Sequence, residues 1–203
     1  NAPITVGRSR RSLLFFAALY HHVGKPTIAR QQGASIIEHE KVSARLTNER
    51  ARQLALSQGE IRLLEALITQ QGRIHHMVAA GGLPDCLSTY HYFRDLNAAG
   101  IDLCFLSLAD TLATYMASLQ QDRWTYELDI CRHLMEAWWE KKSELVDPPR
   151  LVSGHDLISH FNLTPGPSIG MLLEAIRESQ VCDQLNNKET ALEFAANWLE
   201  NQG

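Results

Sequence analysis

Hydrophobic side chains recur at helical spacing along most of this chain. The first apolar face spans Leu13 to Tyr20, and a second segment of the same period runs from about 36 to 56. No run alternates apolar and polar positions with the β-branched residues typical of a strand. The pattern therefore predicts an all-α fold.

Capping and helix-breaking residues predict where these helices begin and end. Ser57 with Glu60 forms the pattern of a capping box, which opens a helix over 61–71. Pro84 stands where a helix favours its first residue, before a helix over 87–96. Gly100 separates that helix from the next, over 103–119, and Asp122 is expected to cap a long helix that ends near residue 142.

Two consecutive prolines predict a boundary in the last third of the chain. Pro148 and Pro149 end any helix before them, so we expect a helical domain over 1–147 and a small helical subdomain over 148–203. Three shorter helices are predicted in this subdomain. Their starts are a Ser153–Asp156 box, the pair Thr164-Pro165 and an Asn187 cap.

Charge is distributed unevenly along the 203 residues. The total is −4, but residues 1–50 carry +5, residues 51–150 carry −4 and residues 151–203 carry −5. The total excludes a uniformly basic nucleic-acid coat, and a polyanionic partner should prefer the first quarter of the chain. The longest apolar run, at 13–20, is too short to span a bilayer, so no membrane partner is expected.

The four cysteines are widely spaced and form no CxxC pair. This spacing argues against a zinc ribbon and a disulfide scaffold, and it predicts free thiols in a cytoplasmic protein. No secretory signal is recognisable, and the chain begins with Asn1 instead of Met, as expected of a processed product or a piece of a longer protein.

A histidine pair at the end of the first helix is the strongest chemical signal. His21 and His22 follow the apolar helix and precede Gly24-Lys25-Pro26. Imidazoles at this place can bind a metal, or they can simply meet the negative end of the helix dipole. The residues alone leave both interpretations open.

The same segment resembles the signature of HD-domain proteins, in which a helix ends in His-Asp-Val/Ile-Gly-Lys-Pro. His21 matches the motif's His, His22 stands in place of its Asp, and Asp110 matches the later Asp ligand. The family's earlier His has no counterpart in this sequence. With two of four usual ligands kept, the resemblance implies a degenerate site with remnants at His21, His22 and Asp110, and no bound metal.

An ordered set of further motifs resembles the bacterial tRNA nucleotidyltransferase/poly(A) polymerase-like family, the relatives of the CCA-adding enzymes. The motifs lie at residues 38–41, 90–95, 100–114, 151–157 and 163–174. The resemblance implies the C-terminal half of such an enzyme, a helical bundle derived from an HD domain that helps to hold RNA. The family's catalytic head carries a Gly-Ser pair and an Asp-x-Asp pair, and this sequence has neither. We therefore expect no catalytic residues here, no transferase activity, and Mg²⁺ with ATP or CTP only in the head domain.

Basic side chains are the simplest RNA contacts, because they pair with phosphates. Lys25, Arg30, Arg73 and Arg94 are the predicted RNA-binding residues. The expected partners are tRNA or another RNA 3′ end, and an N-terminal nucleotidyltransferase domain of the same protein. His155-Asp156 also reads as an HD dipeptide, but the capping box explains its Asp.

Two other functions remain open. A metal-dependent HD phosphohydrolase acting on nucleotides would need His21, His22, His39, His75, His76 or Asp110 to converge on a metal. A scaffold or dimerisation module, with Trp138 and Trp139 at its interface, would form a homodimer without RNA.

Overall fold

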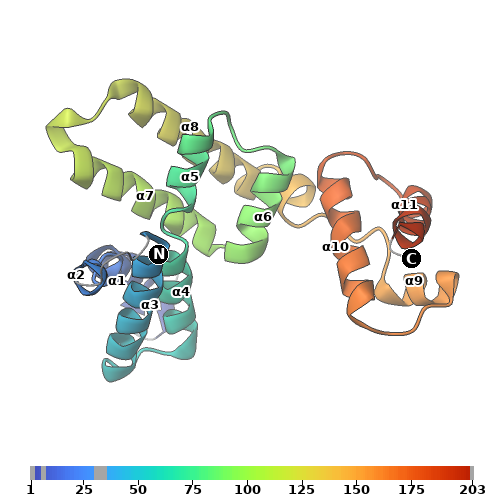
Figure 1. Cartoon of the computed structure of the whole chain (residues 1–203), viewed down its shortest axis with the longest axis horizontal. Coiled ribbons are helices and arrows are strands. Elements are labelled where there is room, and N and C mark those ends of the chain that lie inside the picture. The colour runs from blue at the N-terminus through green and yellow to red at the C-terminus, as the bar shows by residue number, and fades with distance from the viewer. Residues whose placement is uncertain (1–2, 6–7, 30–35, 202–203) are drawn as a thin grey trace. The chain divides into compact units, whose positions relative to one another are not determined.

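The computed structural model describes residues 3–5, 8–29 and 36–201, and most of them are helical (Figure 1). The elements in chain order are β1 (Pro3–Thr5), β2 (Arg8–Ser9), α1 (Arg10–Tyr20), α2 (Lys25–Ile28), α3 (Ile36–Gln53), α4 (Gln58–Thr69), α5 (Arg73–Ala80), α6 (Cys86–Leu96), α7 (Ala99–Tyr115), η1 (Met116–Ser118), α8 (Gln121–Trp139), η2 (Lys142–Val146), α9 (Gly154–Phe161), α10 (Pro167–Val181) and α11 (Lys188–Glu200). The all-α prediction is confirmed. The strands β1 and β2 form one short antiparallel pair ahead of α1.

The chain forms two compact units. The first unit comprises residues 1–83 and 96–133, and the second comprises 84–95 and 134–203. The second unit thus includes most of α6 and the last residues of α8 as well as the C-terminal part of the chain. The domain boundary expected after residue 147 stays a prediction.

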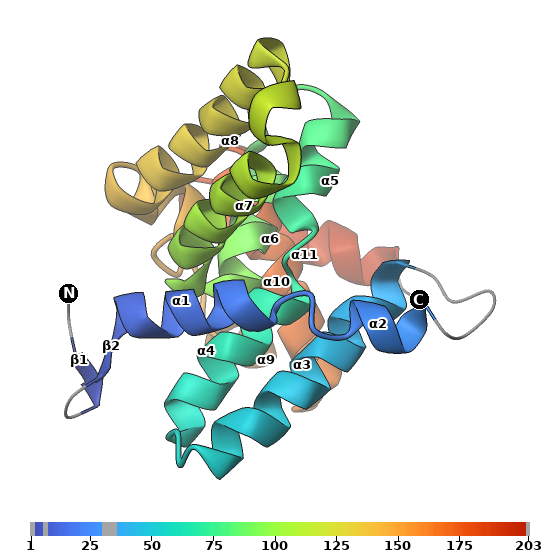
Figure 2. The same cartoon turned by 90° about the vertical axis from the view of Figure 1, so that its left-hand side faces the viewer.

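The first unit is organised around α4. This helix pairs with α3 and also contacts α1 and α7 (Figure 2). Its side chains Leu64, Leu67 and Ile68 are fully buried, because three helices cover it. Gly24, just before α2, permits a close approach to α3: a Cβ there would lie 2.7 Å from the His39 carbonyl oxygen.

The second unit has its core between three helices, α9, α10 and α11, drawn in orange to red in Figure 1. Leu157 and Leu172 are fully buried at its centre, together with Ala191 and Ala195 of α11. The small alanine side chains let α11 pack closely against its neighbours. In the same unit, Trp138 packs on Phe93 with ring centroids 5.1 Å apart.

Three helix starts in the chain match the capping predictions. Ser57 accepts a hydrogen bond from the Glu60 amide, and the Glu60 carboxylate accepts one from the Ser57 amide. Ser153 and Asp156 form the second box, and Asn187 caps α11 through the amide of Thr190. These caps depend only on residues three positions apart, which is why the sequence predicts them.

Other predicted boundaries are wrong by a few residues. Gly100 lies inside α7 and is buried, and the break falls at Asn97, whose φ is +48°. An asparagine adopts this left-handed conformation more readily than most residues, so it ends α6 as a glycine would. Asp85, not Pro84, caps α6 by accepting from the Ser88 amide. Gly166 and Pro167, not Thr164-Pro165, open α10.

The expectation of four free thiols is also wrong. Cys86 at the start of α6 and Cys182 at the end of α10 form a disulfide within the second unit. Their Cα atoms lie 5.5 Å apart although 96 positions separate them in sequence, so packing alone brings them together. Cys104 and Cys131 are buried thiols.

Within the described ranges, no single helix is both long and apolar enough to cross a membrane. The bent pair α6 and α7 would pass on length and composition when taken together.

Candidate functional site

A cavity of about 670 Å³ lies in the first unit. Its walls come from the turn after α1, from α2, α3 and α7, and from the start of α5 and of α8. The polar side chains on these walls are His21, His22, Lys25, His39, Glu40, Gln71, His75, His76, Ser107, Asp110, Thr111, Thr114, Tyr115 and Arg123. Five imidazoles in one cavity indicate a chemical site more than a packing defect.

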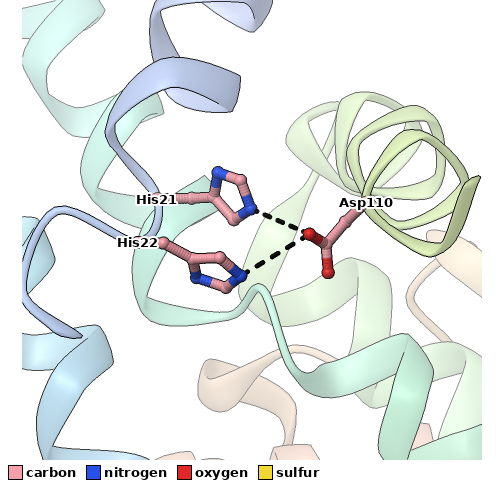
Figure 3. A group of neighbouring side chains, drawn as sticks. All are labelled: His21, His22 and Asp110. Carbon is pink, nitrogen blue, oxygen red and sulfur yellow. Dashed lines mark hydrogen bonds and ion pairs between the residues drawn. The ribbon is translucent and has the colours of Figure 1, made fainter. Parts of the chain in front are cut away.

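Asp110 of α7 is the point on which the histidine pair converges (Figure 3). The Nε2 atom of His21 lies 3.2 Å from Asp110 Oδ1, and the Nε2 atom of His22 lies 3.5 Å from the same oxygen. The two imidazole rings lie against each other, with centroids 3.9 Å apart. The structure thus brings together all three residues that the resemblance named as HD remnants.

The hydrogen bonds of His21 decide what can lie between it and Asp110. Its Nδ1 donates to the carbonyl oxygen of Ala18 at 2.8 Å, so a neutral ring would carry its lone pair on Nε2. A lone pair facing a carboxylate oxygen is repulsive. A cation between the two residues would remove this repulsion.

His75 of α5 contacts Asp110 from another side. Its Nε2 lies 3.5 Å from Asp110 Oδ2, and its Nδ1 lies 3.8 Å from Glu127 Oε1. Contacts with His21, then with His22 and His75, hold the pKa of Asp110 far below its usual range. The carboxylate of Asp110 is therefore ionised at neutral pH.

Glu127 of α8 is a buried carboxylate that the sequence did not single out. It is fully buried and accepts hydrogen bonds from Ser107 at 2.7 Å and from Thr111 at 2.8 Å. Both donors lie one turn apart on α7. The spacing of Ser107 and Thr111 is the only signal in the sequence that could have indicated this acceptor.

Gln71 and Gly24 position the histidine pair. Gln71 Nε2 donates to the His21 carbonyl oxygen at 2.9 Å, and the Gly24 amide donates to Ser43 Oγ at 2.9 Å. These two bonds fix the backbone on both sides of the pair. No sequence pattern predicts these two hydrogen bonds, because donor and acceptor are 50 residues apart in the first and 19 residues apart in the second.

The residues predicted to bind RNA are not brought together. Lys25 is exposed at the rim of the cavity. Arg73 is the first residue of α5, the helix that also carries His75 and His76 of the cavity wall. Arg30 lies outside the described residues. Arg94 belongs to the second unit, where its guanidinium is bound to Glu174 at 2.6 Å and to Asp95 at 3.1 Å. His75 and His76 lie in the first turn of α5.

The aromatic residues around Arg94 are not available for base stacking. Tyr90, Tyr92 and Phe93 are all buried and belong to the core. Trp138 packs on Phe93, whereas Trp139 is 62% exposed. The two tryptophans therefore point in different directions, as their adjacent positions on α8 require.

Two side-chain groups in the described part of the chain have the spacing to hold a metal ion. The first is His21, His22 and Asp110, whose donor atoms lie within 4.8 Å of one another. The second is His91, Glu174 and Glu178 of the second unit, where Arg94 already neutralises Glu174. The first group fits a divalent metal better, because imidazoles and one carboxylate form a typical donor set for such an ion.

Comparison with known proteins agrees with this picture. Residues 109–196 match the family model for tRNA nucleotidyltransferase domain 2. The A-adding tRNA nucleotidyltransferase of Deinococcus radiodurans is 30% identical over 193 residues, which cover 93% of this chain and 42% of that protein. The chain thus spans less than half the length of this relative, and no solved structure matches it. The chain is therefore a distant homologue of a tRNA nucleotidyltransferase over most of its length, and its residues 109–196 are similar to the family described as putative tRNA nucleotidyltransferase domain 2.

Proposed function

We propose that this chain binds tRNA and positions its 3′ end for a nucleotidyltransferase catalytic domain. The observation that carries the proposal is similarity to an A-adding tRNA nucleotidyltransferase along 93% of the chain. The chain itself supplies no catalytic group for nucleotide addition. Mg²⁺ and the nucleotide, ATP or CTP, would bind to the catalytic domain.

The rim of the cavity in the first unit supports RNA contact. Lys25 is exposed there, and Arg73 begins the helix that carries the cavity's His75 and His76. Phosphate contacts by such side chains release counterions from the RNA, so the affinity falls as the salt concentration rises. Arg94 is a weaker contact than the sequence predicted, because RNA would have to compete with its two carboxylate partners.

Fluorescence anisotropy with a labelled tRNA, from low to physiological salt, tests this proposal. We expect binding whose affinity falls steeply with salt, and Lys25→Gln should lower the slope by about one. Arg132→Gln is the matched control, since Arg132 is exposed and already paired with Asp129. Absence of tRNA binding even at low salt would overturn the proposal.

A second candidate function is metal-dependent hydrolysis of a phosphate ester. The observation that favours it is the convergence of the Nε2 atoms of His21 and His22 on one oxygen of Asp110, at 3.2 and 3.5 Å. His22 and Asp110 would complete the ligand set, and a metal there would polarise a phosphoryl oxygen. His75 contacts the other oxygen of Asp110, and the buried Glu127 contacts His75 in turn, so these two residues would orient the Asp110 carboxylate.

Metal titration by calorimetry distinguishes this candidate. One equivalent of Mn²⁺, Ni²⁺ or Zn²⁺ should bind to the wild-type chain and not to His21→Ala or Asp110→Asn. His155→Ala is the control, because His155 is exposed and belongs to the capping region of α9. Substoichiometric binding by the wild-type chain would exclude this function.

A further inference from the structure

A small hollow in the second unit combines two arginines that have no carboxylate partner. It measures about 270 Å³ and lies between the segment 150–154 and α10. Arg150 and Arg177 line it, with Gly154 and Gly170 beside them and the side chains of Val152, Leu173 and Ile176 supplying apolar wall. Neither guanidinium forms an ion pair with a carboxylate in the described part of the chain.

Five other arginines in the described part of the chain are paired with a carboxylate, whereas others, such as Arg11 and Arg62, are not. Arg8, Arg10, Arg45, Arg94 and Arg132 each have a carboxylate oxygen within 3.1 Å. Residues 151–203 contain seven acidic side chains but only two basic ones, Arg177 and Lys188, and Lys188 is bound to Asp156. Arg177 therefore keeps its charge uncompensated in the most acidic part of the protein.

One carboxylate, that of Glu174, also lines the hollow. Its Oε1 accepts from Arg94 at 2.6 Å, and its Oε2 accepts from the Tyr90 hydroxyl at 3.3 Å. Arg94 therefore neutralises Glu174 from outside the hollow. Arg177 also bonds to the Tyr90 hydroxyl, which takes one of its five N–H groups and leaves its charge uncompensated.

The backbone around Arg150 is anchored, and the hollow is open. Gln180 Nε2 donates to the Pro149 carbonyl oxygen at 2.9 Å, which ties the segment before Arg150 to α10. A Cβ at Gly170 would meet no atom within 4 Å, so nothing fills the space beside that glycine. The two arginines therefore line an open hollow, and the backbone before Arg150 is held to α10 by a hydrogen bond.

We propose that this hollow binds one phosphate of the RNA backbone, with Arg150 and Arg177 as its cationic ligands. A guanidinium group can bind two phosphate oxygens at once, and two of these groups together exceed the single negative charge of one phosphodiester. The volume is below the roughly 300 Å³ of pockets that enclose a drug-sized ligand, which favours a phosphate group over a whole nucleotide. The inference rests on the proposed tRNA binding and names a surface that takes part in it.

The test is tRNA anisotropy with the full chain and four variants. Arg150→Gln and Arg177→Gln should each weaken binding about tenfold at low salt and lower the salt slope by about one. Gly170→Glu should weaken it at least as much, because it places a carboxylate in the open space of the hollow. Lys188→Gln is the control, since it removes the same charge from the same unit outside the hollow. Circular dichroism establishes that each variant is folded. If Arg177→Gln does not fold, Gly170→Glu still tests the hollow.

The outcomes separate this inference from the proposed function. Wild-type binding with all three hollow variants unchanged would overturn the hollow and leave tRNA binding intact. Equal losses in the Lys188→Gln control would show that only net charge matters, which also overturns it. Failure of the wild-type chain to bind tRNA would overturn both.

Discussion

Asp110 shows how one carboxylate organises a site. Three imidazoles from two segments, His21 and His22 after α1 and His75 in α5, lie within 3.5 Å of its oxygens. Each contact favours the ionised form, so the pKa of Asp110 is lower in the folded chain than in the unfolded chain. This difference links the protein's stability to pH.

The Asp110→Asn substitution should flatten the acid side of the stability profile. A depressed carboxyl pKa stabilises the folded state above the unfolded value of about 3.9, and that contribution is lost as pH falls through and below it. We expect the wild-type chain to be about 2 kcal/mol more stable than the variant at neutral pH, and the gap to narrow with acid. Urea unfolding at a series of pH values measures both curves.

Glu136→Gln provides the comparison for that experiment. Glu136 is an exposed carboxylate on α8, so its removal should change the acid dependence little. Parallel curves for wild type and Asp110→Asn would show that the imidazole contacts do not stabilise the folded chain.

Between α7 and α8, a single buried carboxylate replaces part of the usual apolar packing. Glu127 accepts from Ser107 and Thr111, and the three side chains satisfy one another away from water. A buried carboxylate is costly unless it is hydrogen-bonded in this way. The pairing of the two helices is therefore specific to these residues.

Truncation of Glu127 should be strongly destabilising. Glu127→Ala removes the acceptor of two buried hydroxyls and leaves a cavity, so we expect a loss of roughly 2–4 kcal/mol in the free energy of unfolding. Glu127→Gln should cost less, because an amide keeps one oxygen acceptor and hydroxyls can rotate to accept from its NH₂. Chemical denaturation ranks the two variants, and a smaller loss for alanine than for glutamine would contradict this account.

The Cys86–Cys182 disulfide closes a long loop, because its two cysteines are 96 positions apart in the sequence. It ties α6 to α10, while the polar contacts of Tyr90, His91 and Arg94 with Glu174 and Glu178 link the same two helices. Because the loop contains the whole of α7 and α8, its closure restricts much of the unfolded chain.

Reduction should therefore lower stability measurably. In the chain-entropy model a loop of about 100 residues contributes about 4.7 kcal/mol, an upper value for this bond. We expect dithiothreitol, or the pair Cys86→Ser and Cys182→Ser, to lower the melting temperature. A thiol assay in denaturant should count the two buried thiols, Cys104 and Cys131, before reduction and all four cysteines after it. Four thiols in the untreated protein would exclude the disulfide.

Local rules predicted more of this molecule than long-range ones. The caps at Ser57, Ser153 and Asn187 were correct because each involves an amide only three residues away. The sequence predicted the helix break at Gly100 because glycine favours turns more strongly than asparagine. In the structure Gly100 is buried inside α7, and the break falls at Asn97. The partner of Arg94 lies 80 residues along the chain, so no sequence pattern could show that its charge is already compensated.

The amino-acid sequence by itself determined the all-α character, most helix starts and the histidine pair, together with its relation to Asp110 through family resemblance. These follow from periodicity and from hydrogen bonds that close within one helical turn. Only the tertiary structure decided that His75 joins Asp110, that Cys86 meets Cys182, and that Arg150 and Arg177 share a hollow. Such contacts depend on how helices distant in sequence pack, because burial and distance set their energy and residue type alone does not.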